Sequence, residues 1–176
     1  GSEMCIRDRG QGLMVKKWDY TTEPRAVVLV HADTKDYDHP EPAELCYSMA
    51  RTICRRLEEK AVSYRFAANA AFDLLLNAAL SGEEWRKPLE TPQGYGPEHY
   101  RKVLEILGRA TGQTSLSCAR FCAEYYHPQE QVGCIVVTTE PEEAVRAAVQ
   151  PLPGIPLLVL TPEMAVEMVQ TGEAGA

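Results

Sequence analysis

The sequence predicts an α/β protein with a doubly wound, mostly parallel sheet and helices on both faces, a three-layer sandwich. The run at 26–31 is apolar up to His31, which is typical of a strand buried on both faces. Further strand-like runs lie at 62–67, 133–138 and 155–160, and segments of helical periodicity separate them. Strands that alternate with helices in this way favour a parallel sheet covered by helices.

The first elements follow from these patterns. Residues 13–18 alternate between apolar and polar side chains, which predicts an edge strand before the buried strand at 26–31. Pro42 suits the first turn of a helix, and apolar residues then recur every four positions as far as Leu57. Because this helix connects the strands at 26–31 and 62–67, we expect those two strands to be parallel and the crossover to be right-handed.

The middle of the chain is less regular. The Ala-rich segment 69–80 fits either a helix or a short strand, and the Gly- and Pro-containing segment 82–97 predicts an irregular loop. Apolar residues return to helical spacing at 98–110 and again at 116–126. We therefore expect two consecutive helices, broken near Gly112.

Two further strand–helix units end the chain. The run at 133–138 predicts another buried strand, and Pro141 followed by two glutamates places proline and acids where a helix N-terminus favours them. The run at 155–160 predicts the last strand. Thr161 and Pro162 then predict the cap and first turn of a final helix.

Composition limits the function classes. The chain has 176 residues and a formal net charge of −7, which argues against sequence-independent binding to nucleic acid, because that needs clustered Lys and Arg. No apolar run approaches the roughly 20 residues of a membrane span and no signal peptide is visible, so we expect a soluble segment without membrane insertion. We expect a single domain over 12–170, a tail at 171–176, and an artefact of cloning or sequencing without regular structure at 1–11.

The six cysteines show neither the paired C-x-x-C spacing of a zinc ribbon nor the density of a disulfide scaffold. We expect buried, reduced thiols. Cys118 and Cys122, one helical turn apart, form the alternative, a metal-binding or redox pair.

Five segments resemble, in order and spacing, the C-terminal half of the domain-of-unknown-function family 58 (DUF58). They are 13–18, 26–31, 64–70, 100–110 and 134–139. The resemblance covers residues 12–165 and implies a von Willebrand factor A-like fold, a Rossmann-like three-layer sandwich.

The resemblance also implies a biological setting. It implies a fragment of a longer, membrane-anchored bacterial protein, with two spanning helices and a β-rich region upstream and the family's Trp-Lys-Ser-Ala-Arg signature just before Gly12. Proteins of this group commonly occur alongside MoxR-type AAA+ ATPases. The expected role is therefore that of an interaction module at the cytoplasmic face of the membrane, with such an ATPase as a protein partner.

The loop after the strand at 26–31 is where an open α/β sheet binds its ligands. Von Willebrand A domains often hold Mg²⁺ there through Asp-x-Ser-x-Ser, a threonine on a second loop and a further acid, because this hard cation prefers oxygen ligands. In this chain Asp33, Thr114 and Glu140 stand in for those ligands, but both serines are missing and Lys35 would compete with a dication. We expect a degenerate site without metal. A Mg²⁺-dependent, adhesion-type binding domain is the alternative.

An enzyme hypothesis from another class rests on nitrogen and oxygen ligands in the same loop, enough for a hydrolytic metal centre. These ligands are His31, Asp33, Asp36, Asp38 and His39. No downstream motif completes the set, and no Gly-rich phosphate loop or nucleophile elbow stands in the right context.

The function predicted from the sequence is therefore non-catalytic binding of a protein partner, without a cofactor, through the loops at the carboxyl ends of the strands. The residues expected at this rim are Asp33, Thr34, Lys35 and Asp36.

Overall fold

The computed structural model describes residues 2–7, 13–18, 24–70 and 87–165. In the first two of these ranges only the backbone is described. The elements, in chain order, are β1 (Ser2–Arg7), β2 (Leu13–Trp18), β3 (Arg25–His31), α1 (Glu41–Glu59), β4 (Ser63–Asn69), β5 (Leu89–Glu90), α2 (Pro97–Arg109), α3 (Cys118–Tyr125), the 3-10 helix η2 (Pro128–Glu130), β6 (Gly133–Thr138), α4 (Glu142–Ala148) and β7 (Leu157–Leu160).

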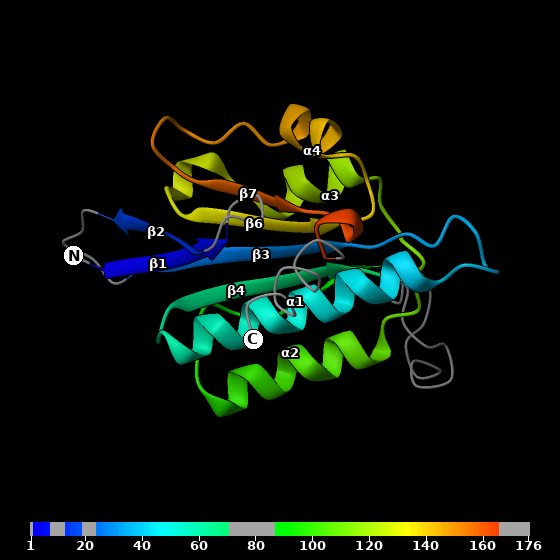
Figure 1. Ribbon diagram of the computed structural model, residues 1–176, viewed down its shortest axis with the longest axis horizontal. Helices are drawn as coiled ribbons and strands as arrows, with labels where there is room; N and C mark the ends of the chain where they lie inside the picture. Colours follow the sequence, from blue (N-terminus) through cyan, green and yellow to red (C-terminus); the bar gives the residue numbers. More distant parts are fainter. Residues whose placement is uncertain (1, 8–12, 19–23, 71–86, 166–176) are drawn as a thin grey trace.

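A five-stranded sheet forms the centre of the molecule, in the order β5-β4-β3-β6-β7 (Figure 1). Neighbouring strands are parallel except for β5, which pairs antiparallel with β4. The predicted mostly parallel α/β sheet is thereby confirmed. Counted along the chain, the five strands follow the spatial order 3-2-1-4-5, in which the chain builds one side of the sheet outward from the central strand and then returns to build the other side.

Helices cover both faces of this sheet, α1 and α2 on one side and α3 and α4 on the other (Figure 1). Strand β3 shows why its sequence carries no polar alternation. Val28 and Val30 pack into the core beneath α1 and α2, whereas Val27 and Leu29 pack into the core beneath α3 and α4. All four side chains are at most 1% exposed. Full burial stabilises each by about 1.5–3 kcal/mol, so both faces of β3 hold the layers together.

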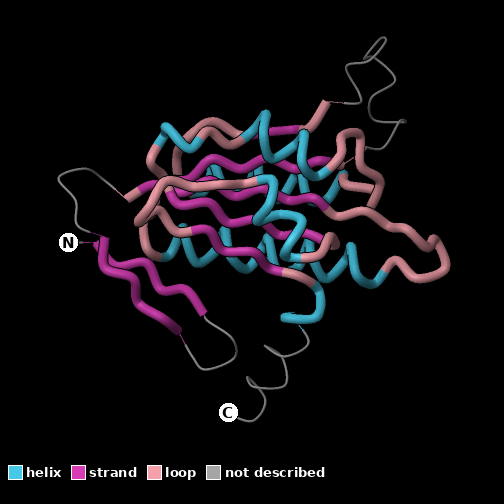
Figure 2. The backbone as a smooth tube through the Cα atoms, turned by 90° about the horizontal axis from the view of Figure 1, so that it is seen from above, coloured by secondary structure: helices cyan, strands magenta, loops and turns pink. Residues whose placement is uncertain are grey.

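The N-terminal strands differ from the prediction. Strand β2 does not lie at an edge of the five-stranded sheet; it pairs antiparallel with β1 in a separate two-stranded sheet, with Cys5 opposite Val15 (Figure 2). Residues 1–11, expected to lack regular structure, thus contain β1. An alternating pattern predicts a strand but not its partner, and a neighbouring segment supplies that partner here.

The predicted loop at 82–97 also contains regular structure in the part that is described. Leu89 and Glu90 form β5 against β4, and Thr91 exchanges bonds with Phe66: its backbone N–H donates to the Phe66 carbonyl at 2.8 Å and its Oγ1 accepts from the Phe66 amide at 3.1 Å. A strand of two residues between prolines is too short to show the alternation by which strands are predicted from sequence. The ambiguous segment 69–80 lies outside the described residues beyond Ala70.

The remaining elements lie close to their predicted bounds. The strand predicted at 155–160 begins two residues later, at Leu157, because Pro156 has no N–H to donate to a ladder. Residues 162–165 are helical after Thr161, as predicted. Among the described helices, none combines the length and the apolar character that a membrane crossing requires.

Candidate functional site

The candidate site lies where β3 and β6 end side by side. From β3 the chain crosses by α1 to β4 on one side, and from β6 it crosses by α4 to β7 on the other. The carboxyl ends of such a pair form the switch point of a doubly wound sheet, where ligands bind. Three connections meet at this edge: 32–40 after β3, 139–141 after β6, and 112–117 before α3, which we call the rim segment.

Backbone bonds fix the first residues after β3. The Asp33 N–H donates to Thr139 Oγ1 at 2.9 Å, and the Thr139 N–H donates to the His31 carbonyl at 3.1 Å. The Thr34 N–H donates to the Gly112 carbonyl at 2.6 Å. The loop after β3 is therefore tied both to the loop after β6 and to the rim segment.

An ion pair crosses the switch point. The Lys35 Nζ lies 3.3 Å from Glu140 Oε1 and 3.4 Å from Oε2, while the Glu140 N–H donates to Thr138 Oγ1 at 3.0 Å. The Lys35 side chain is 66% exposed, so this pair adds less than about 1 kcal/mol to stability. The ion pair matters more for metal binding than for stability, because the Lys35 ammonium already neutralises the Glu140 carboxylate that a metal ion would need as a ligand.

The three residues predicted as metal ligands are each held by different partners. Glu140 pairs with Lys35, Asp33 is held through its backbone by Thr139, and Thr114 is half-buried in the rim segment. In the described ranges, no three or more His, Cys, Asp or Glu side chains gather closely enough to hold a metal ion.

The ligands of the hydrolase hypothesis are also separated. His31 is 2% exposed beneath α3, whereas Asp36, Asp38 and His39 form an exposed turn. Within that turn Asp36 Oδ1 accepts from the Asp38 N–H at 3.0 Å, and the His39 N–H donates to the Asp36 carbonyl at 3.0 Å. The pleat explains the separation, because it turns the side chain of the last strand residue inward while the turn projects beyond the sheet.

Sequence reasoning missed a buried polar row behind this edge. His31, Asn69 and Thr138 end three adjacent strands and stand opposite one another in register. All three are at most 2% exposed. The available signal was a polar residue at the end of each apolar run, since a buried polar side chain needs partners there.

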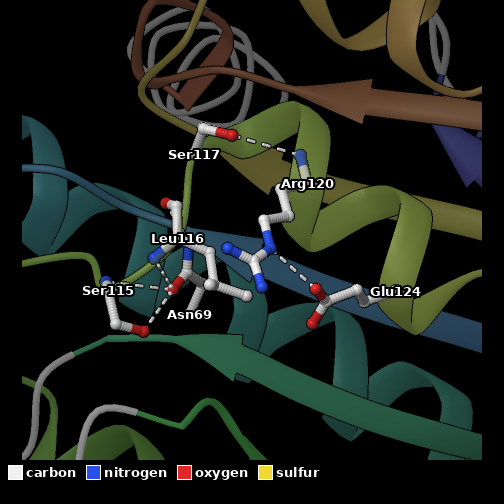
Figure 3. A network of polar contacts seen from close by, with 6 residues as sticks. All are labelled: Asn69, Ser115, Leu116, Ser117, Arg120 and Glu124. Atoms are coloured by element: carbon white, nitrogen blue, oxygen red, sulfur yellow. Dashed lines mark hydrogen bonds and ion pairs between the residues drawn. The ribbon is translucent and has the colours of Figure 1, made fainter.

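Asn69 binds the rim segment (Figure 3). Its Oδ1 accepts from the Ser115 N–H at 3.2 Å, the Ser115 hydroxyl at 3.1 Å and the Leu116 N–H at 3.2 Å, and its Nδ2 donates to the Leu116 carbonyl at 2.8 Å. The next residue, Ser117, caps α3 by accepting from the Arg120 N–H at 3.2 Å. The amide therefore holds the two residues that precede the cap of α3.

The orientation of Asn69 also defines the protonation of His31. Because three donors point at Oδ1, the amide nitrogen is the atom that faces His31 Nδ1, at 2.7 Å. An amide nitrogen only donates, so Nδ1 accepts and the proton resides on Nε2. Burial lowers the pKa of His31, with Glu140 and Asp33 acting in the opposite direction and Lys35 in the same one. The ring is neutral at pH 7.

Cys118 and Cys122 lie one turn apart on α3, as their spacing predicts, and Cys118 contacts Thr138 of this row. A hydrogen bond from the buried Cys122 thiol lowers the pKa of Cys118, helped by Thr138 and opposed by burial and by Glu140. The same contact and burial raise the pKa of Cys122 far above its usual range. Cys118 is half-exposed and is the first residue of α3. It is the thiol in this pair that would ionise first.

Compared with protein-family models, with curated proteins and with solved structures, the chain shows no significant match to any of them.

Proposed function

We propose that this chain is a non-catalytic, von Willebrand factor A-like interaction domain related to the C-terminal part of DUF58, and that it binds a protein partner at the switch point. The observation that carries the proposal is the polar loop 33–39, which lies outside the carboxyl ends of the central strands and is half-buried to exposed throughout. The resemblance to DUF58 makes a MoxR-type AAA+ ATPase the partner class to test, and we propose on the same ground that the domain belongs to a longer, membrane-anchored bacterial protein.

The strand order supports the fold assignment. Two neighbouring strands whose crossovers leave in opposite directions, as those of β3 and β6 do, form the arrangement that gives doubly wound folds their binding crevice. The residues that carry the resemblance include β3, β4, α2 and β6, which are the elements that build this edge.

The shape of the loop supports a macromolecular partner. Residues 34–39 project beyond the sheet edge (Figure 1). Tyr37 is 74% exposed there, and its hydroxyl accepts from Gln113 Nε2 at 3.3 Å. Tyrosine is enriched among the residues that dominate protein interfaces, because it buries a large ring and keeps a polar tip.

The ion pair of Lys35 with Glu140 supports binding without a metal. A dication at this edge would have to displace the ammonium from both carboxylate oxygens and would find no serine hydroxyl in the 32–40 loop. The partner would then be bound by direct polar and aromatic contacts, in place of a partner carboxylate that coordinates a metal ion.

A binding measurement tests the proposal. A purified MoxR-type AAA+ ATPase from the source organism is titrated with the wild-type chain and with the double variant Asp33→Ala/Lys35→Ala, and we expect Kd to rise at least about tenfold. The matched control is Arg55→Ala/Glu59→Ala. It removes one acid and one base from an exposed α1 pair near the opposite edge of the sheet and should leave Kd unchanged.

Replacing residues 34–39 by a Gly-Ser linker of the same length gives the decisive variant. It should abolish binding while the melting transition persists. Undiminished binding by this variant would refute the proposed surface.

A further inference from the structure

The rim segment 112–117 connects α2 to α3 without regular secondary structure. Its backbone polar groups therefore need partners outside any helix or strand. At one end, the Gly112 carbonyl accepts from Thr34 and the Gly112 N–H donates to Tyr47 Oη at 3.0 Å. At the other end, Ser115 and Leu116 depend on one side chain, Asn69.

The hydrogen-bonding capacity of Asn69 is fully used. A carboxamide oxygen offers two lone pairs and a carboxamide nitrogen two hydrogens. The oxygen faces three donors, two backbone N–H groups and the Ser115 hydroxyl, which is one more than its lone pairs, and the nitrogen uses both hydrogens, on the Leu116 carbonyl and on His31 Nδ1. The side chain is fully buried, so no water can replace a lost bond without a rearrangement.

We infer that Asn69 is the positioning residue of the partner-binding edge: its amide holds the rim segment on the strand ends and thereby keeps the rim segment and the loop after β3 in one arrangement. The inference rests on the proposed function for its biological meaning. Its structural content stands on the contacts alone and is measured without a partner.

The connection between the two loops runs through short steps. Asn69 holds Ser115 and Leu116, and three residues earlier in the same segment Gly112 holds Thr34. His31 contacts the other side of the Asn69 amide and precedes Thr34 by three residues. Its carbonyl accepts from the Thr139 N–H. Release of the rim segment therefore frees the Thr34 N–H as well as the N–H groups of Ser115 and Leu116.

Amide hydrogen exchange followed by NMR tests this inference on the whole chain. In Asn69→Leu we expect exchange at Ser115, Leu116 and Thr34 to accelerate at least about tenfold, because their acceptors are lost or loosened. The matched control is Thr91→Val, which removes an equally buried hydroxyl that accepts from the Phe66 N–H away from this edge. It should leave those three amides at the wild-type rate.

Asn69→Asp separates positioning from general destabilisation and covers the case in which Asn69→Leu fails to fold. A carboxylate still accepts from Ser115 and Leu116, so their exchange should stay within about threefold of wild type. It can donate neither to the Leu116 carbonyl nor to His31 Nδ1, the two partners of the Asn69 Nδ2. The His31 ring should therefore protonate at Nδ1 and donate to the carboxylate, and the pKa of His31 should rise in an NMR titration. Equal exchange rates at the three amides in Asn69→Leu and Thr91→Val, or an unchanged His31 titration in Asn69→Asp, would overturn the inference. Either result leaves the proposed partner surface to be judged by its own binding measurement.

Discussion

Gly112 packs directly against Thr34. The Thr34 N–H donates to the Gly112 carbonyl at 2.6 Å, and Gly112 has a φ of +75°, in the region that favours glycine. A Cβ at position 112 would collide with Thr34 Oγ1. This contact joins the rim segment to the loop after β3, the two parts of the candidate surface.

The first prediction concerns that contact. Gly112→Ala combines a left-handed backbone with a steric clash, so we expect it to lower the free energy of unfolding by about 1–3 kcal/mol in urea denaturation. Gly108→Ala is the control: position 108 lies within α2 with open space around a Cβ, and alanine there should be neutral or stabilising by about 0.5–1 kcal/mol. Equal losses in the two variants would contradict this account.

The second prediction is a pH dependence of stability. Burial lowers the pKa of His31 from its ordinary 6.5, so below that pH the unfolded chain binds a proton that the folded chain resists. Stability should therefore be complete above about pH 6.5 and decline as the pH falls from there toward the lower folded pKa. Burial also lowers the pKa of His99, whose buried Nε2 has no hydrogen-bond partner among the described residues, so His99 adds a change of the same sign.

Urea denaturation between pH 5 and pH 8 measures this dependence, with about 0.5 pH unit between points. His31→Gln keeps an acceptor for Asn69 but does not titrate, so its stability should change less with pH than that of the wild type. A wild-type profile that is flat or that rises toward acid would exclude a buried neutral His31.

The third prediction concerns thiol reactivity. Burial raises the pKa of Cys54 and Cys134 and raises that of Cys46 to about 12, whereas the pKa of the half-exposed Cys118 is lowered by the Cys122 hydrogen bond. Iodoacetamide should therefore modify Cys118 at least about tenfold faster than Cys46, Cys54 and Cys134 in the folded protein. Peptide mass spectrometry resolves each site, and Thr138→Val, which removes a second hydrogen bond to Cys118, should slow its modification.

The fourth prediction concerns metal. Because Lys35 contacts both oxygens of Glu140, Mg²⁺ should leave Tm unchanged when about 5 mM MgCl₂ is compared with about 15 mM NaCl, which has the same ionic strength. A site with a Kd near 50 µM would stabilise the folded state by about 2.7 kcal/mol under these conditions, an increase of several degrees. Such an increase would support the metal-dependent alternative and count against direct recognition.

Part of this architecture could be predicted because it is encoded locally. A strand buried on both faces must be apolar at every position, as Val27 and Val28 show, and an amphipathic helix must repeat its apolar residues every turn. Both patterns lie within a few residues of sequence. The α/β class, the central strands and the main helices follow from them.

The candidate site was predicted in position but not in contacts. That ligands of a doubly wound sheet bind beyond the central strands follows from topology, and Asp33 and Lys35 lie there. Which side chains meet them does not follow, because the contact of Lys35 with Glu140 joins residues 105 positions apart. Sequence patterns did not single out Asn69, because one asparagine after an apolar run forms no periodic pattern.

The sequence by itself therefore determined the fold class, the buried strands and the edge at which a ligand should bind, because burial on one or both faces dictates residue type along a local segment. The tertiary structure alone decided that β2 pairs with β1, that β5 closes the sheet beside β4, and that Asn69 holds the rim segment. These pairings depend on which backbone and side-chain polar groups the packed layers bring within hydrogen-bond distance of one another. A pattern within a short stretch of sequence contains no information about that distance.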